Sequence, residues 1–205
     1  MSRLLITMLL LVAFIVPVGA IEWNPIATRV AKSLAYLSGP QGDCTAFVID
    51  SKRDLVLTAG HCDQRTSSGE SAMLVDNIPT KVISKDTKKD LLVLEVKGLD
   101  KPALYLAKTE PQVGDEVASY GYGYSLSKPL FRVTHISAID TEEAPDMILT
   151  DTDFVQGQSG APVVNAGGEV VMIVNAGDGT KVGLGVGAET IKARMGRYFE
   201  RVVTP

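Results

Sequence analysis

Residues 157–162 of the chain read Gly-Gln-Ser-Gly-Ala-Pro, which are residue types that a nucleophilic serine needs around it. A serine hydroxyl is a weak nucleophile at neutral pH, so it requires a base to take its proton and donors to hold the oxyanion that forms. Gly157 can adopt backbone angles that turn its own N–H and that of Ser159 toward one point. The stretch therefore predicts a nucleophile beside an oxyanion hole, with a plain turn as the alternative because glycine and serine are common in turns.

A histidine suited to act as the base stands at position 61, at the end of an apolar run and directly before Cys62. A lone histidine is often a surface residue, but one placed on a turn beside a disulfide is favoured as a general base. The other histidine of the chain, His135, falls inside the expected strand 130–139 and is interpreted as a satisfied strand residue.

A carboxylate that would orient this base stands at Asp90, directly before the apolar run of residues 91–94. At the mouth of a buried strand an aspartate loses hydration, which suits one that accepts the histidine N–H and fixes its tautomer. Taken alone, Asp90 is better interpreted as the end of a polar loop.

The start of the chain is typical of a secretory signal, with a positive charge at Arg3, an apolar run over residues 4–16 and small residues up to Ala20. We expect cleavage after Ala20 and a secreted or periplasmic protein. The alternative is an uncleaved anchor, because residues 4–21 carry no charge. No membrane span is expected once the signal is removed.

Cys44 and Cys62 are the two cysteines of the chain, and in an oxidising compartment we expect them to pair. Closing a loop of this size stabilises a fold by roughly 3 kcal/mol. A metal site is not expected, because the cysteines and histidines match no zinc spacing. No cofactor is expected either.

Short apolar runs of strand length, separated by turn residues, fill most of the chain. In the first half they are residues 33–37, 45–49, 55–58, 72–75, 81–84 and 91–96. After a polar connector over residues 97–112, they are residues 116–120, 130–139, 147–150, 161–165, 170–176 and 182–187. Residues 190–201 have the pattern of a helix that Thr190 caps.

This pattern predicts an all-β protein of two six-stranded antiparallel barrels with a C-terminal helix. The expected organisation is a signal peptide over residues 1–20, a first barrel over residues 21–110 and a second barrel with the terminal helix over residues 111–205. The 20 basic and 24 acidic residues give a formal net charge of −4, and the basic clusters are interrupted. Nucleic-acid binding is therefore not expected, and the oligomeric state is left open.

Three motifs now show a resemblance. Thr-Ala-Gly-His-Cys at 58–62, Asp-Leu-Leu-Val-Leu at 90–94 and Gly-Gln-Ser-Gly at 157–160 resemble, in this order, the catalytic motifs of the chymotrypsin-like serine peptidases. The second half resembles the bacterial HtrA-type branch, on residues 113–115, 148–151 and 168–171. The first half is more similar to glutamyl endopeptidases and trypsins. The PDZ module that usually follows an HtrA-type barrel pair is not expected here.

The resemblance implies a chymotrypsin-like double barrel with its active site in the cleft between the barrels. It also implies a secreted serine endopeptidase that cleaves protein or peptide substrates through an acyl-enzyme intermediate. By position, His61 is the general base, Asp90 orients it and Ser159 attacks the carbonyl, while the N–H groups of Gly157 and Ser159 bind the oxyanion. A catalytically silent or latent binding protein on the same barrels is the alternative function.

The resemblance leaves the specificity open. Residues Asn175, Ala176 and Gly177 match the segment that pairs with the substrate backbone and walls the specificity pocket. Asp153 has the spacing of the trypsin aspartate that selects basic residues, whereas the HtrA-type alignment turns Asp153 outward and lets Phe154 or Val155 shape a pocket for small apolar residues.

Two further interpretations are disfavoured. A glutamyl preference is less favoured because Asn175 stands where the glutamyl endopeptidases carry a histidine. The α/β-hydrolase fold is excluded, since its elbow has glycine where this chain has Ala161 and its serine precedes the other two triad residues. Because Gln158 replaces the aspartate that pairs with a new N-terminus in trypsins, activation by that salt bridge is not expected.

Overall fold

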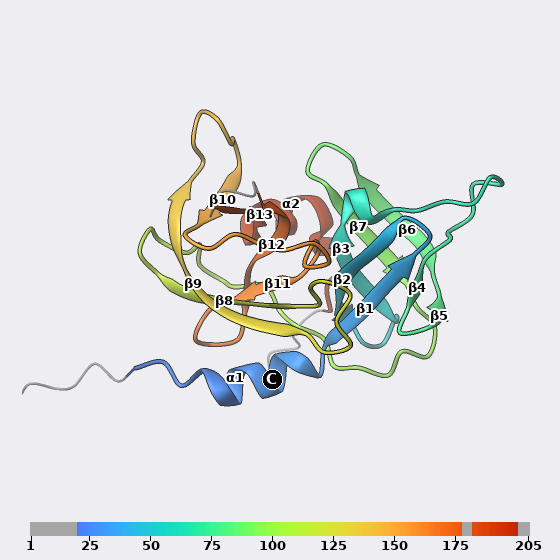
Figure 1. The fold of residues 1–205 in the computed structure, drawn as a ribbon, viewed down its shortest axis with the longest axis horizontal. Coiled ribbons are helices and arrows are strands. Elements are labelled where there is room, and N and C mark those ends of the chain that lie inside the picture. Colours follow the sequence, from blue (N-terminus) through green and yellow to red (C-terminus); the bar gives the residue numbers. More distant parts are fainter. Residues whose placement is uncertain (1–19, 178–181, 201–205) are drawn as a thin grey trace, which may run out of the picture.

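The computed structural model describes residues 20–177 and 182–200, which form two β-structures side by side (Figure 1). Residues 1–19, and with them nearly all of the expected signal peptide, lie outside the described part of the chain. Among the described residues, no helix is long and apolar enough to cross a membrane.

The first β-structure is an antiparallel sheet of seven strands in the order β5-β4-β1-β2-β3-β7-β6. The strands are β1 (Leu34–Gly39), β2 (Gly42–Asp50), β3 (Leu55–Ala59), β4 (Leu74–Val75), β5 (Ile78–Pro79), β6 (Lys81–Asp86) and β7 (Leu91–Glu95). Side chains of β7 alternate between two apolar clusters, since Leu91 and Val93 belong to one and Leu92 and Leu94 to the other. A strand buried on both faces needs a continuous apolar run, which explains the run after Asp90.

The expectation of a closed six-stranded first barrel is wrong, because this sheet has a seventh strand and curls without closing between β5 and β6. β4 and β5 have two residues each and form a tight hairpin through Asp76 and Asn77, both at positive φ. β5 and β6 lie at opposite ends of the strand order and do not pair with each other, so the sheet stays open between them.

The second β-structure is a closed barrel of six strands in the order β10-β13-β12-β11-β8-β9, as the sequence predicts. The strands are β8 (Glu116–Gly121), β9 (Leu130–Ile139), β10 (Met147–Thr150), β11 (Pro162–Val164), β12 (Val170–Gly177) and β13 (Gly183–Gly187). One apolar cluster contains residues of both β-structures, such as Leu57 of the sheet and Ile173 of the barrel. The two halves are therefore fixed against each other by a shared core.

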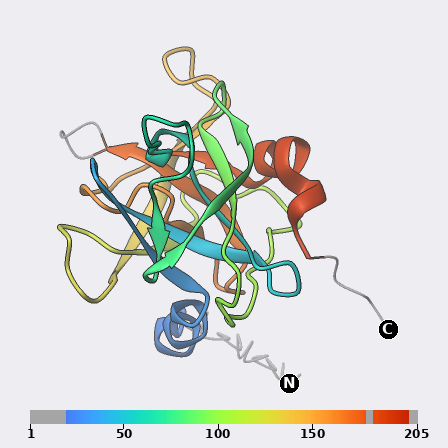
Figure 2. The same cartoon turned by 90° about the vertical axis from the view of Figure 1, so that its right-hand side faces the viewer.

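Helix α1 (Trp23–Ala31) precedes the first sheet and lies below the barrel in Figures 1 and 2. The sequence analysis did not predict it. Its buried residues Ile26 and Val30 join the shared core, and the Trp23 indole donates a hydrogen bond to Glu116 at 2.7 Å.

The C-terminal helix α2 spans Ala188–Met195 and continues as a 3₁₀ turn, η2 (Gly196–Tyr198). The prediction that it starts with Thr190 as its cap is wrong, because Gly187 is the N-cap residue. Ile191 and Met195 are buried on its inner face, as the pattern indicated.

Candidate active site

Ser159 lies in a loop between β10 and β11 whose backbone is fixed by glycines. Gly157 and Gly160 adopt φ angles of +94° and +83°, in the left-handed region that favours glycine. A Cβ on Gly160 would lie 2.2 Å from the carbonyl oxygen of Thr45, so the loop approaches the first sheet more closely than any other residue allows. Both glycines thus allow positive φ angles, and Gly160 also leaves room for the close contact with Thr45.

Two carbonyl groups of this loop are held by hydrogen bonds from backbone N–H groups. The carbonyl of Gln156 accepts the Tyr124 N–H at 2.8 Å, and that of Gln158 accepts the Ala161 N–H at 2.8 Å. In a trans peptide the N–H points opposite to the C=O, so the N–H groups of Gly157 and Ser159 point away from these partners. Neither N–H donates a hydrogen bond to a residue that the structure describes. Two free donors near the serine are what an oxyanion hole requires.

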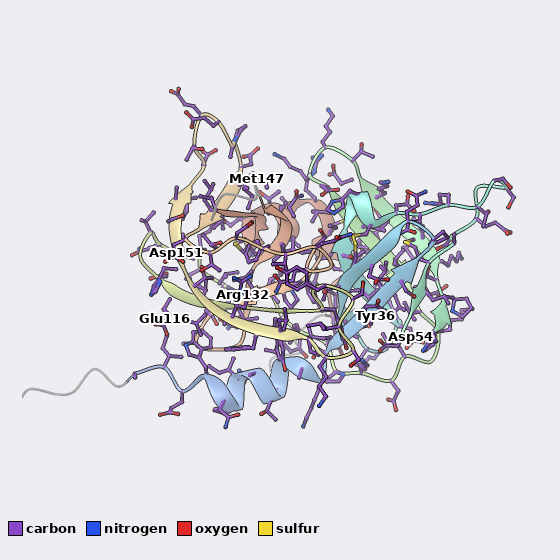
Figure 3. All side chains as sticks on the ribbon, in the orientation of Figure 1. Tyr36, Asp54, Glu116, Arg132, Met147 and Asp151 are labelled. Carbon is purple, nitrogen blue, oxygen red and sulfur yellow. A yellow bond between two sulfur atoms is a disulfide. The ribbon has the colours of Figure 1, made fainter. Side chains whose placement is uncertain are left out.

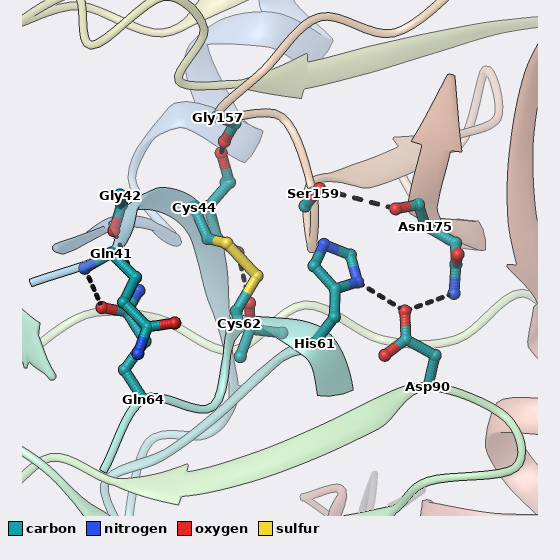
Figure 4. The surroundings of a disulfide bond; sticks show 12 residues. Gln41, Gly42, Cys44, His61, Cys62, Gln64, Asp90, Gly157, Ser159 and Asn175 are labelled. Atoms are coloured by element: carbon teal, nitrogen blue, oxygen red, sulfur yellow. Dashed lines mark hydrogen bonds and ion pairs between the residues drawn. A yellow bond between two sulfur atoms is a disulfide. The ribbon is translucent and has the colours of Figure 1, made fainter. Parts of the chain in front are cut away.

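His61 lies in a single 3₁₀ turn, η1 (Gly60–Cys62), directly after β3. Its Nδ1 lies 2.6 Å from Oδ2 of Asp90, and Figure 4 shows the imidazole between the side chains of Asp90 and Ser159. Asp90 has φ of +51°, and its carbonyl accepts the Gly60 N–H at 2.8 Å. A Cβ on Gly60 would come within 2.8 Å of Oδ1 of Asp90, which explains the glycine before the histidine.

Asn175 connects the aspartate with the serine. Its side-chain amide donates to Oδ2 of Asp90 at 2.7 Å, and its carbonyl accepts the Ser159 hydroxyl at 3.5 Å (Figure 4). The register of β12 against β13 shifts between Val174 and Ala176, so Asn175 is a bulge residue. The sequence predicts Asn175 as a wall of the substrate site, but the bond to Asp90 was missed, because a bulge leaves no signal in an apolar strand.

A pocket of about 420 Å³ brings these groups together. It is lined by His61, Phe154, Val155, Gln156, Ser159, Val174 and Asn175. Asp153 is not among the lining residues, and its carbonyl accepts a hydrogen bond from Arg132 at 2.9 Å. The buried Phe154 ring fills the space that a side chain at Gly183 would need, 2.4 Å from that Cβ position. The pocket therefore presents apolar side chains beside the serine.

The predicted disulfide between Cys44 and Cys62 is present and ties β2 to the turn that carries His61 (Figure 4). The two sulfur atoms and the His61 ring lie within 4.8 Å of one another, as metal ligands would. Disulfide sulfurs are not thiolates, however, and the thiolate is the form that binds metal. The cluster is explained by the disulfide.

The other histidine lies on the outer surface of the barrel. His135 Nδ1 lies 3.1 Å from Oδ2 of Asp151, and its Nε2 lies 3.8 Å from Oε2 of Glu116. Figure 3 shows Glu116 and Asp151 on the side of the barrel that faces away from the first sheet. His135 is thus remote from Ser159 and has a partner on each nitrogen.

The fold and this pocket define a trypsin-like double-barrel protein. Residues 44–173 match the trypsin-like peptidase domain, and this match spans more than half of the chain. The chain belongs to the trypsin-like peptidase family.

Several bacterial proteases are similar to it. A probable periplasmic DegP-like serine endoprotease of Buchnera aphidicola is 27% identical over 169 residues, 77% of this chain and 35% of that protein. Another of Hahella chejuensis is 35% identical over 101 residues, 47% of this chain and 21% of that protein. The serine endoprotease of Yersinia pestis has the same fold, with a TM-score of 0.72, 19% identity and coverage of 88% of this chain and 67% of that one.

These relatives confirm the resemblance to the HtrA-type branch. The chain spans about a third or less of the length of the two curated relatives.

Proposed function

We propose that the protein is a serine endopeptidase with Ser159 as nucleophile, His61 as general base and acid, and Asp90 as the residue that orients His61. The observation that carries this proposal is the short contact between Asp90 and Nδ1 of His61, which lines the same pocket as Ser159. A carboxylate on Nδ1 keeps the proton there and leaves Nε2 free to take the serine proton. The free N–H groups of Gly157 and Ser159 support the oxyanion hole.

The chemistry follows from these positions. Ser159 Oγ attacks the scissile carbonyl carbon while its proton passes to His61, and the carbonyl oxygen becomes an oxyanion held by two backbone N–H groups. His61 then gives the proton to the leaving amine as the C–N bond breaks, which leaves an acyl-enzyme. Water, deprotonated by His61, attacks the ester and releases the acid and Ser159.

The substrate backbone would lie along the end of β12. Ala176 and Gly177 pair with β13 on one side, and the carbonyl of the bulged Asn175 accepts the long 3.5 Å hydrogen bond from Ser159. A substrate strand added here would offer an N–H to that carbonyl and release the serine hydroxyl toward His61. Hydrogen bonds at a catalytic site often tighten only with substrate bound.

The substrate residue before the cleaved bond is expected to be small and apolar. Phe154, Val155 and Val174 supply an apolar lining, and Asp153 is outside it, which weakens the hypothesis of a basic preference. Cleavage of a peptide library with mass-spectrometric readout tests this. Cleavage mainly after Lys or Arg would reverse the assignment and return Asp153 to the pocket.

We further propose a secreted or periplasmic location, because the signal-like start of the chain agrees with the periplasmic DegP-like relatives. Fractionation of cells that express the full chain, with the N-terminus of the exported form sequenced, tests both the location and cleavage after Ala20.

Reaction with a fluorophosphonate probe tests the proposed activity directly. The probe phosphonylates a serine that its neighbours have activated, with loss of fluoride, so we expect labelling of wild type at Ser159 and none of Ser159→Ala. Ser137→Ala, which changes an exposed serine of β9, is the matched control and is expected to label normally. A folded wild type that neither labels nor cleaves peptides would show a latent or binding protein instead.

A further inference from the structure

Thr45 is a fully buried residue of the first sheet that contacts the nucleophile loop of the second barrel. It follows Cys44 in β2, and its own N–H donates to the carbonyl of Ser159 at 2.9 Å. Its carbonyl accepts the hydroxyl of Thr58, three residues before His61, at 2.8 Å. The backbone of Thr45 therefore lies between the segments that carry the base and the nucleophile.

The Thr45 hydroxyl makes three more contacts, all with backbone groups of the second barrel, and the longest is to the carbonyl of Tyr122 at 3.5 Å. Its Oγ1 donates to the carbonyl of Gly157 at 2.9 Å and accepts the N–H of Tyr122 at 2.8 Å. A Cβ on Gly121 would lie 2.9 Å from this oxygen, so the segment before Tyr122 is also fitted around it. One atom of the first sheet thus joins two loops of the barrel.

Both loops control the direction of the Gly157 N–H. The segment that begins at Tyr122 also supplies the Tyr124 N–H, which holds the carbonyl of Gln156 and so sets the peptide that carries the Gly157 N–H. The bond from Thr45 to the Gly157 carbonyl fixes the next peptide. No other donor of the described residues bonds the Gly157 carbonyl, and the peptide is then held only through its other end, where the Gln158 N–H donates to the Val155 carbonyl at 3.0 Å. Loss of the hydroxyl therefore loosens this peptide at Gly157, the residue with the widest choice of backbone angles.

We infer that Thr45 is a positioning residue of the oxyanion hole, acting through Gly157 and Tyr122. The inference rests on the proposed function. A positioning role has different consequences from a role in stability alone. Because the oxyanion exists only in the transition state, a misdirected donor lowers kcat more than it raises KM. The disulfide joins Cys44, the neighbour of Thr45, to Cys62, the neighbour of His61. It therefore also links the hydrogen bonds of Thr45 to the proposed general base.

The test is a comparison of Thr45→Val, which removes the hydroxyl at nearly constant shape, with Thr45→Ser, which keeps it. Removal of an oxyanion donor lowers kcat by about 10² to 10³, and a donor that is loosened rather than removed should cost less. We expect Thr45→Val to lower kcat by about 30-fold with KM nearly unchanged, and Thr45→Ser to stay within about threefold of wild type.

A second readout separates positioning from stability. A peptide aldehyde forms a tetrahedral adduct that uses the oxyanion hole, whereas the corresponding peptide alcohol forms none, so Thr45→Val should weaken the aldehyde alone. Thr134→Val is the matched control, because it removes the hydroxyl of another buried threonine, which bonds Asp151 on the far side of the barrel. It is expected to lower thermal stability without changing kcat.

A fully active Thr45→Val, or equal weakening of aldehyde and alcohol, would overturn the inference. If Thr45→Val does not fold by circular dichroism, Thr45→Ala is measured in its place, and failure of both to fold assigns Thr45 to the fold instead. A wild type that neither labels with the fluorophosphonate nor cleaves peptides contradicts the proposed function itself. An active wild type with an active Thr45→Val contradicts only the role of Thr45.

Discussion

The two histidines of the chain have similar acidic partners but different surroundings. In each case Nδ1 faces Oδ2 of an aspartate, at 2.6 Å for His61 and Asp90 and at 3.1 Å for His135 and Asp151. The side chains are almost equally exposed, at 48% and 49%. A histidine–aspartate pair on a partly open surface is therefore no sign of catalysis by itself.

The difference lies in what surrounds the pair. Asp90 receives a second hydrogen bond from Asn175, and the pocket of His61 contains Ser159 and two free N–H donors nearby. His135 instead has a second carboxylate, Glu116, at its Nε2. On the proposed function, the serine in the same pocket and the unbonded N–H donors distinguish His61 from the surface ion pair of His135.

Replacing each histidine by alanine gives the largest expected contrast. His61→Ala should lower kcat by about 10⁶-fold, because the serine loses its proton acceptor. His135→Ala should leave kcat within about twofold. Hydrolysis of a fluorogenic peptide measures both, and a large loss in His135→Ala would mean that the outer pair takes part in the reaction.

The same comparison applies to the aspartates. Asp90→Asn should lower kcat by about four orders of magnitude, because the amide presents an N–H to His61 and disfavours the required tautomer. Asp151→Asn is the matched change at the other pair and should have little effect on the rate. A loss under tenfold in Asp90→Asn would point to another acid.

The sequence predicts the three proposed triad residues as a group, because each stands in a local motif whose glycines and apolar run are required by backbone contacts. Gly60 packs closely against Asp90, and Gly160 against Thr45, so the glycines of these motifs reflect contacts that the folded chain requires. The strands follow from alternation between two apolar clusters. Signals of this kind are visible in a single stretch of chain.

Helix α1, the open edge of the first sheet and the contacts of Asn175 and Thr45 could not be predicted, because each depends on residues distant in sequence. The apolar face of α1 has two buried residues, Ile26 and Val30, and its Trp23 bonds a residue 93 positions later. Asn175 reaches Asp90 across 85 positions. No local pattern reports such contacts.

Asn175→Ala should sharpen the distinction between the pairs by removing the second hydrogen bond of Asp90. A hydrogen bond to a charged group contributes about 1.5–3 kcal/mol, so kcat is expected to fall by about tenfold if most of that is felt in the transition state. Hydrolysis of a fluorogenic peptide measures the change, and an unchanged rate would limit Asn175 to binding the substrate backbone.

A smaller effect is expected at Arg194 of α2. Its Nε donates to Oδ2 of Asp86 at 2.5 Å, and Oδ1 of Asp86 accepts the N–H groups of Lys88 and Lys89 at 3.0 Å, directly before Asp90. The hydrogen bond from Arg194 keeps the pKa of Asp86 below its usual value.

Since Arg194 is largely exposed, the ion pair is weak. Arg194→Ala should lower kcat/KM by about twofold to threefold. Lys192→Ala, on the exposed side of the same helix, is the control and should have no effect. Equal losses in both variants would indicate a general effect of surface charge.

The ion pair between His135 and Asp151 is expected to affect the free energy of unfolding rather than kcat. Hydrogen bonds from Thr134 and from the backbone of His135 lower the pKa of Asp151 to about 2, against about 3.9 in an unfolded chain. The ionised form is therefore favoured by folding, and this contribution is complete above about pH 5 and is lost progressively as the pH falls to about 2. Urea unfolding between pH 2 and 5 should show a weaker pH dependence for Asp151→Asn. An identical pH dependence would mean that the carboxylate is equally solvated in both states.

The long-range contacts of α1 have a consequence for the order in which the chain folds during synthesis. The ribosome delivers the N-terminus first, so α1 emerges long before Glu116, to which Trp23 bonds. The disulfide partners are only 18 residues apart and are both available early. In the oxidising compartment where a disulfide forms, this short loop can close while Ile26 and Val30 still lack the barrel side of their core, and α1 is expected to be among the last elements to dock.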